Sequence, residues 1–171
     1  DRMRLVHRLA DRNWREGNGG PFAALVAEQD SGRIVLGGVN GVLTSGVSVA
    51  HAEGLALGLA QTATGSWDLG GKGMPGHELV VNWRPCVKCY GATMWSGVRG
   101  LVVAGEGREL EEITTFDEGP VREDWAGQFE ERGIQVVGDV LREEALAVFR
   151  AYREAVDADE VDVYNARGGS E

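Results

Sequence analysis

The sequence predicts a single α/β domain, a three-layer α-β-α sandwich in which helices cover both faces of one sheet. Short apolar runs typical of strands alternate along the chain with longer segments typical of helices. The 171 residues suit one domain with a sizeable core, and no internal repeat or linker divides them. We therefore expect one domain over residues 1–171.

In the N-terminal half, an apolar stripe that includes Val6 and Leu9 predicts an amphipathic first helix, which the glycine-rich stretch before Pro21 ends. Two apolar runs around an Asp-Ser-Gly turn then predict a β-hairpin. A Gly/Ser/Thr-rich loop follows, then an Ala/Leu-rich buried helix and a Gly-rich exposed loop. We expect these elements at residues 2–15, 22–39, 41–50, 51–63 and 64–76.

In the C-terminal half, an apolar run ends at Arg84-Pro85 and predicts a strand, because proline cannot donate to a central ladder. The next segment is helical and carries both cysteines in its first turn. Two further apolar strands, two helices and a long acidic loop complete the pattern. We expect strands at residues 78–83, 101–104 and 134–137, helices at 86–96, 122–132 and 141–156, and a loop at 105–120.

Two short motifs, His51-Ala52-Glu53 and Pro85–Cys89, contain the candidate metal-binding and catalytic residues. His51, Cys86 and Cys89 are metal ligands, and Glu53 is a carboxylate beside them that is not a ligand. Three protein ligands leave the fourth corner of a zinc tetrahedron open for water, which distinguishes a catalytic zinc ion from a structural one. Glu53 is then a general acid/base within reach of that water.

Two other interpretations of the cysteine pair account for less of the sequence. A redox Cys-x-x-Cys would leave the His-Ala-Glu motif at the start of another helix unexplained. A structural zinc site needs a fourth ligand, and the remaining histidines, His7 and His77, stand in no motif with the cysteines. A catalytic zinc site is therefore the prediction.

The charge balance bears on partners. The formal net charge is -10, and the basic residues are dispersed among acidic ones, whereas nucleic-acid binders usually carry a basic face. We expect a small, weakly charged substrate, with nucleic acid disfavoured. No apolar run approaches the ~20 residues that span a bilayer. The single Cys-x-x-Cys pair is compatible with a disulfide in a secreted protein, and with metal or redox chemistry in a cytosolic one; we expect a cytoplasmic protein.

At these motifs the chain resembles the cytidine deaminase-like superfamily of zinc deaminases, which carry His-x-Glu and Pro-Cys-x-x-Cys. Within it, the sequence is most similar to the branch of bacterial guanine, nucleoside and tRNA adenosine deaminases. The resemblance covers residues 2–104. It rests on the stretches Gly19–Ala24, Asn40, His51–Glu53, Pro85–Cys89 and Gly91–Trp95.

The resemblance implies a mixed five-stranded sheet, one Zn²⁺ per chain and hydrolytic release of ammonia from a nucleobase or nucleoside. It favours a purine such as guanine or guanosine. The alternatives are a cytosine or cytidine type of substrate, an aminotriazine, and tRNA adenosine. Relatives are commonly homodimers, and they close the pocket with C-terminal residues, sometimes from the partner subunit. The counterpart here is the tail at residues 158–171.

The resemblance also implies roles for individual residues. Glu53 shuttles the proton, and Glu118, the second acid of a Phe-Asp-Glu loop, helps to bind the purine and move protons. An acidic surface turn is the alternative for that loop, and composition alone marks Asn40 as a turn residue. The residues implied in substrate binding are Asn40, Ala52 through its backbone N–H, Phe22 or Trp95 as a stacking ring, Asp117 and Tyr164.

The sequence departs from the family beside the metal ligands. The family usually has Glu-Pro-Cys, whereas Arg84 precedes Pro85 here, and Asn82-Trp83 replaces the common Thr or Ser at that strand end. These residues stand next to the reaction centre, so we expect them to influence which ring enters.

Overall fold

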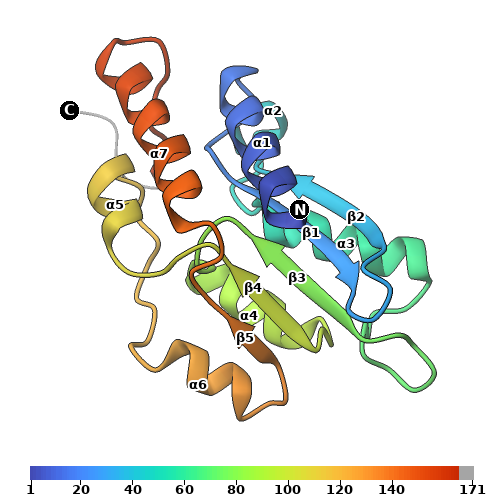
Figure 1. The fold of residues 1–171 in the computed structure, drawn as a ribbon. Helices are drawn as coiled ribbons and strands as arrows, with labels where there is room; N and C mark the ends of the chain where they lie inside the picture. The colour runs from blue at the N-terminus through green and yellow to red at the C-terminus, as the bar shows by residue number, and fades with distance from the viewer. Residues whose placement is uncertain (166–171) are drawn as a thin grey trace.

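A mixed five-stranded sheet forms the centre of the molecule, whose computed structural model describes residues 1–165 (Figure 1). The strands are β1 (Ala23–Glu28), β2 (Ile34–Val39), β3 (His77–Val81), β4 (Gly100–Val103) and β5 (Gln135–Val137), in the spatial order β2-β1-β3-β4-β5. β1 pairs antiparallel with β2 and β3, and β3, β4 and β5 run parallel. The loops that leave β3 and β4 therefore start at the same edge of the sheet.

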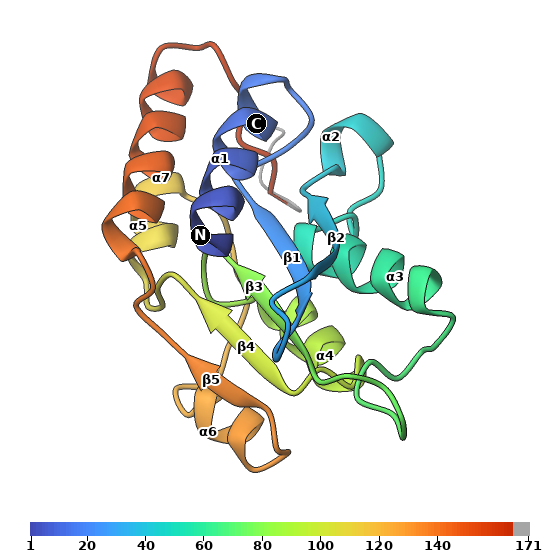
Figure 2. The same cartoon turned by 45° about the vertical axis from the view of Figure 1, so that its right-hand side comes forward.

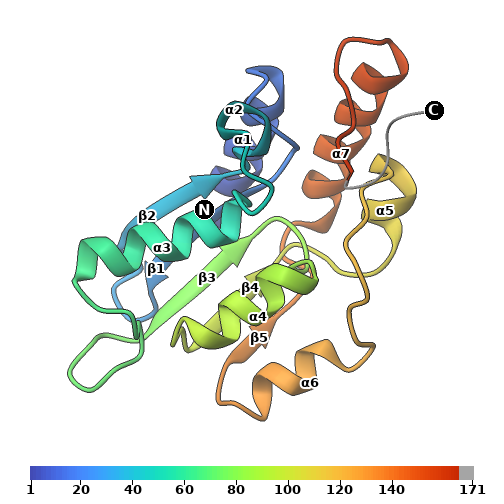
Figure 3. The ribbon, with the colours of Figure 1, turned by 180° about the vertical axis from the view of Figure 1, so that it is seen from behind.

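Helices cover both faces of this sheet (Figures 2 and 3). One face carries α1 (Arg2–Arg15), α7 (Arg142–Asp157) and the short α5 (Glu109–Thr114), which packs on α7. The opposite face carries α3 (Ala52–Thr64), α4 (Val87–Trp95) and α6 (Trp125–Glu130), while α2 (Val42–Ser45) is a short helix between β2 and α3. The predicted three-layer sandwich is confirmed.

The alternation of side chains in the strands builds two cores. In β3, Leu79 and Val81 join a cluster with the apolar residues of α3, whereas Val80 points to the other face and joins Phe149 of α7. A third cluster of Trp14, Phe116 and Tyr152 lies where α1 and α7 meet the loop after α5. The cores hold the two helical layers at fixed positions around the strand ends.

The structure differs from the sequence prediction mainly in two loops. Residues 41–50 contain α2 and residues 105–120 contain α5, where the sequence predicted loops. These helices were not predicted because segments of four and six residues are too short to show a helical period. The helix expected at 122–132 is shorter and begins at Trp125. Among residues 1–165, no helix is long and apolar enough to cross a lipid bilayer.

Candidate active site

Three ligand atoms converge where two helices begin. His51 precedes the first turn of α3, Cys86 precedes the first turn of α4, and Cys89 lies within that turn. Their ligand atoms all lie within 4.8 Å of one another, and His51 Nδ1 is 3.5 Å from Cys86 Sγ. A tetrahedral zinc ion with bonds of about 2.3 Å to sulfur and about 2.05 Å to nitrogen would hold these two atoms about 3.6 Å apart. The residues therefore fit zinc.

The electrostatics of the cluster favour metal binding. The hydrogen bond from Cys89, together with His51, lowers the pKa of Cys86 to about 4. The same hydrogen bond and burial raise the pKa of Cys89. Both cysteines lie at the positive end of α4, which also stabilises negative charge. One thiolate is thus available before the metal arrives, and metal binding would displace the proton from the second thiol.

Glu53 lies beside this cluster. It is the second residue of α3, only 7% exposed, and it lines a cavity together with His51. Burial, and then the charge of the neighbouring Cys86, raise the pKa of the Glu53 carboxyl above its ordinary value. A buried carboxyl whose pKa is raised holds a proton more readily, which suits general acid/base catalysis.

The cavity has a volume of about 180 Å³. This is below the ~300–1,000 Å³ of pockets for drug-sized ligands. Its walls combine aromatic rings with a few polar groups. Besides His51 and Glu53, it is lined by Phe22, Trp83, Phe116, Tyr164, Asn40, Arg84, Asp117, Glu118, Asn165, Val42, Ser48 and Val81. Such a site suits a small, flat, polar-edged molecule.

Asn40 forms one side of the cavity and is held in a fixed orientation. Its Oδ1 accepts hydrogen bonds from the Tyr164 hydroxyl at 2.7 Å and from the Val42 N–H at 3.2 Å. The Tyr164 oxygen in turn accepts the Gly20 N–H at 2.8 Å. A Cβ at Gly20 would lie 2.9 Å from that oxygen, so this contact needs glycine. With Oδ1 engaged twice, the Asn40 NH₂ group is left to donate to a ligand.

Glu118 forms the opposite side. Its backbone oxygen accepts the Val87 N–H of α4 at 3.0 Å, which places the loop after α5 beside the cysteine helix. Burial, followed by the charges of Cys86 and Glu53, raises the pKa of Glu118 to about 8, and Arg84 acts in the opposite direction. A second carboxyl near the zinc cluster can therefore hold a proton at neutral pH.

The C-terminal segment joins the two sides. Asn165 donates to the Thr115 carbonyl at 2.8 Å and its Oδ1 accepts the Asp117 N–H at 3.0 Å. Tyr164 packs edge to face on Phe116, with ring centroids 5.1 Å apart. The segment reaches the cavity of its own chain. Residues 166–171 of the predicted capping tail lie outside the described residues.

Most of the residues implied by the resemblance lie together. Phe22, Asn40, Asp117, Glu118 and Tyr164 all line the cavity that His51 and Glu53 line. Ala52 is fully buried as the first residue of α3, and its N–H is one of the amides that a first helical turn leaves without an intrahelical acceptor.

Trp95 does not lie with them. It is the last residue of α4 and 84% exposed, and its ring does not line the cavity, whereas that of Phe22, the alternative stacking ring, does. It stands nine residues after Cys86, which is about 13 Å along the helix at ~1.5 Å per residue. Its side chain therefore lies at the end of α4 remote from the ligands.

Several cavity residues were not assigned a site role from the sequence, among them Trp83, Arg84 and Phe116. Trp83 and Arg84 did carry a signal, since they depart from the family pattern directly before Pro85. Asn82 is structural: it is fully buried, accepts the Ala23 N–H at 3.1 Å and donates to the Pro21 carbonyl at 2.9 Å. It joins β3 to the start of β1.

The fold and the site together define a class: a zinc-dependent hydrolytic deaminase, with three zinc ligands and a buried carboxyl that lines a small cavity. Comparisons with known proteins agree. Residues 1–105 match the cytidine and deoxycytidylate deaminase zinc-binding region, and the chain belongs to this family. No curated protein sequence matches the chain.

Solved structures add closer relatives. A guanine deaminase from Nitrosomonas europaea is 46% identical, with a TM-score of 0.86 over 90% of this chain and 83% of that one. The NE0047 protein in complex with 2,6-diaminopurine is 46% identical, with a TM-score of 0.86 over 97% of this chain and 85% of that one. A guanine deaminase from Bacillus subtilis, 24% identical with a TM-score of 0.59 over 76% of this chain and 90% of that one, shares the fold.

Proposed function

We propose that the protein hydrolyses the exocyclic amino group of a free purine base, with guanine as the favoured substrate, and releases ammonia. The observation that carries this proposal is the cavity of about 180 Å³ in which aromatic walls lie beside Glu53 and the zinc ligand His51. Related structures hold 8-azaguanine and 2,6-diaminopurine, which are free bases of this size.

The residues divide the work. His51, Cys86 and Cys89 would hold a zinc ion, which when bound would lower the pKa of a water molecule toward neutrality. Glu53 takes the proton of the attacking water and passes it to a ring nitrogen. After the new C–O bond has formed, Glu53 takes the remaining proton of the added hydroxyl and, with Glu118, delivers it to the amino nitrogen, so that the C–N bond breaks and ammonia departs.

The cavity walls would orient the ring. The Asn40 NH₂ group donates to a ring acceptor, and the Ala52 N–H donates to the ring carbonyl. Phe22, which meets Phe116 edge to face at 5.4 Å, packs on the base, and Asp117 accepts from its polar edge. Tyr164 closes the cavity from the tail. These contacts would recognise a flat ring that has hydrogen-bond donors and acceptors on opposite edges.

A second candidate is the corresponding nucleoside. A groove of about 810 Å³ adjoins the cavity, since Arg84 lines both. A ribose attached to the base would extend into that groove. One measurement distinguishes the two candidate substrates: the ratio of kcat/KM for guanine to kcat/KM for guanosine.

The test of the proposed function is ammonia release from the zinc-loaded protein over a panel of purines, pyrimidines, their nucleosides, aminotriazines and a tRNA anticodon stem-loop. Guanine is expected to give the highest kcat/KM. Glu53→Ala should keep its zinc and lose turnover by roughly 100- to 10,000-fold. The matched control is Glu154→Ala, an exposed residue of α7. Substantial ammonia release by Glu53→Ala would refute the role of that carboxyl.

We also propose a homodimer in the cytoplasm. Leu59 of α3 and Trp95 of α4 are 47% and 84% exposed on adjacent helices, and such apolar side chains favour contact with a second copy. Because Tyr164 reaches its own cavity, this dimer needs no exchange of C-terminal tails. A light-scattering mass equal to one chain would contradict the dimer.

A further inference from the structure

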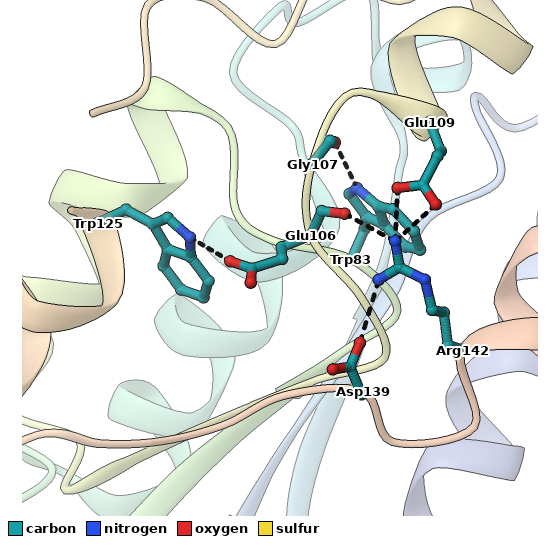
Figure 4. Close-up of polar contacts among 7 residues, drawn as sticks. All are labelled: Trp83, Glu106, Gly107, Glu109, Trp125, Asp139 and Arg142. Atoms are coloured by element: carbon teal, nitrogen blue, oxygen red, sulfur yellow. Dashed lines mark hydrogen bonds and ion pairs between the residues drawn. The ribbon is translucent and has the colours of Figure 1, made fainter. Parts of the chain in front are cut away.

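Arg142, near the start of α7, is the centre of a polar network outside the cavity (Figure 4). Its Nη2 donates to both carboxylate oxygens of Glu109, at 2.6 and 2.5 Å, and to the Glu106 carbonyl at 3.2 Å. Its Nη1 donates to Asp139 at 3.1 Å. The Arg142 side chain is 27% exposed, so this guanidinium is held on several sides and partly shielded from water.

The same guanidinium lies over the ring of Trp83, with its Cζ 5.0 Å from the ring centroid (Figure 4). The indole N–H donates to the Gly107 carbonyl at 3.3 Å, and Phe149 meets the ring edge to face at 5.4 Å. A Cβ at Gly105 would collide with the indole, so the segment after β4 passes directly against it. These neighbours surround the Trp83 ring on several sides.

Arg142 therefore touches one residue of the cavity wall and the start of the segment that leads to another, without lining the cavity itself. Trp83 is one wall. Glu109 is the first residue of α5, and the chain that leaves α5 delivers Phe116 and Glu118 to the other wall. The guanidinium donates to Glu109 and Asp139 from two nitrogens while it lies over the Trp83 ring, and the compact ammonium of a lysine cannot reproduce both contacts.

We propose that Arg142 is a positioning residue for the reaction, which sets the place of Trp83 and of the Glu118 loop relative to the bound base. The inference rests on the proposed function, because it concerns the same cavity. Misplacing a reacting group by about 1 Å costs roughly 100-fold in rate. Release of either wall is therefore expected to lower turnover while the zinc ligands stay in place.

The test compares Arg142→Met, Arg142→Lys and Arg153→Met in zinc-loaded protein. Arg153 is the matched control, since it lies on the same helix and pairs with Asp157 away from the cavity. Arg142→Met should keep its zinc and lose roughly 10- to 100-fold in kcat/KM, with both a lower kcat and a higher KM. Arg142→Lys should recover part of that loss, and Arg153→Met should match the wild type.

A spectroscopic readout separates positioning from stability alone. Protein labelled with 5-fluorotryptophan gives one ¹⁹F resonance per tryptophan, and Trp83→Phe identifies that of Trp83. In base-free Arg142→Met the Trp83 resonance should shift or broaden, whereas Arg153→Met should leave it unchanged. Should Arg142→Met not fold, Glu109→Gln, which removes the charge but keeps the shape of the partner, is expected to give the same changes at smaller size.

The positioning role is overturned if Arg142→Met and Glu109→Gln lower only the melting temperature, with kcat and KM within twofold of wild type and the Trp83 resonance unmoved. It is equally overturned if Arg153→Met loses as much activity. Failure of the proposed function shows differently, as wild-type protein that releases no ammonia from guanine. The base-free Trp83 resonance then still decides whether Arg142 positions that wall.

Discussion

Replacing Tyr164 by phenylalanine removes one hydroxyl that joins the C-terminal segment to Asn40. That hydroxyl accepts the Gly20 N–H at 2.8 Å and donates to Asn40 Oδ1 at 2.7 Å. Burial raises the pKa of Tyr164, so the group stays a donor across the working pH range. In Tyr164→Phe the ring remains packed on Phe116, and the change is confined to these two hydrogen bonds.

The size of the expected effect follows from the hydrogen-bonding groups that lose their partner in this variant. Asn40 Oδ1 keeps the Val42 N–H at 3.2 Å, but the Gly20 N–H loses its partner. A buried donor without an acceptor costs ~1–3 kcal/mol. In addition, Asn40 Oδ1 is held by one hydrogen bond instead of two, which loosens the amide and weakens its hydrogen bond to the base. If ~1–2 kcal/mol of this appears in substrate binding, KM rises roughly 5- to 30-fold, since 1.4 kcal/mol is about tenfold.

The assay is steady-state ammonia release with guanine, with zinc content measured on the same samples. Tyr90→Phe is the matched control, because the Tyr90 hydroxyl has no hydrogen-bond partner in the described part of the chain and does not line the cavity. A Tyr164→Phe enzyme with KM and kcat within twofold of wild type would show that the hydroxyl does not orient Asn40.

Three further outcomes are expected. Cys86→Ala should purify without zinc and without activity, because two ligands remain, and metal analysis showing full occupancy would contradict the ligand assignment. In zinc-free protein, wild type should lose stability relative to Glu118→Gln as the pH rises from 5 to 8, as measured by urea unfolding. The reason is that folded Glu118, with a pKa of about 8 against an ordinary 4.5, holds a proton that the unfolded chain releases in this pH range. A difference in unfolding free energy between the two proteins that stays constant from pH 5 to 8 would argue against the burial of Glu118. Trp95→Ala should keep kcat/KM within twofold of wild type, since its ring lies on the surface, and a large loss would place it in catalysis after all.

The reaction centre was predictable because its determinants are local. His51 and Glu53 stand two residues apart, and Cys86 and Cys89 three apart, each at the start of a helix whose first turn fixes their relative directions. The helical layers followed from periodicity in the same way. Only segments shorter than two turns, α2 and α5, escaped it.

The cavity wall was less predictable because its members come from distant parts of the chain. Asn40 and Tyr164 are separated by 124 residues. The Tyr164 hydroxyl can orient the Asn40 side chain only because the C-terminal segment packs beside the start of β1. Trp95 shows the opposite case, a residue near the ligands in sequence but far from them in space. It belongs to a motif that is contiguous in sequence, yet the length of α4 carries it to the surface.

The sequence by itself therefore determined the zinc ligands, the place of the Glu53 carboxyl beside them and the three layers, since these depend on spacing along one helix or strand. Tertiary structure alone decided the size of the cavity, the orientation of Asn40 and the place of Trp83 under Arg142. The physical reason is that side-chain orientation is set by hydrogen bonds and packing between elements whose order along the chain does not give their order in space.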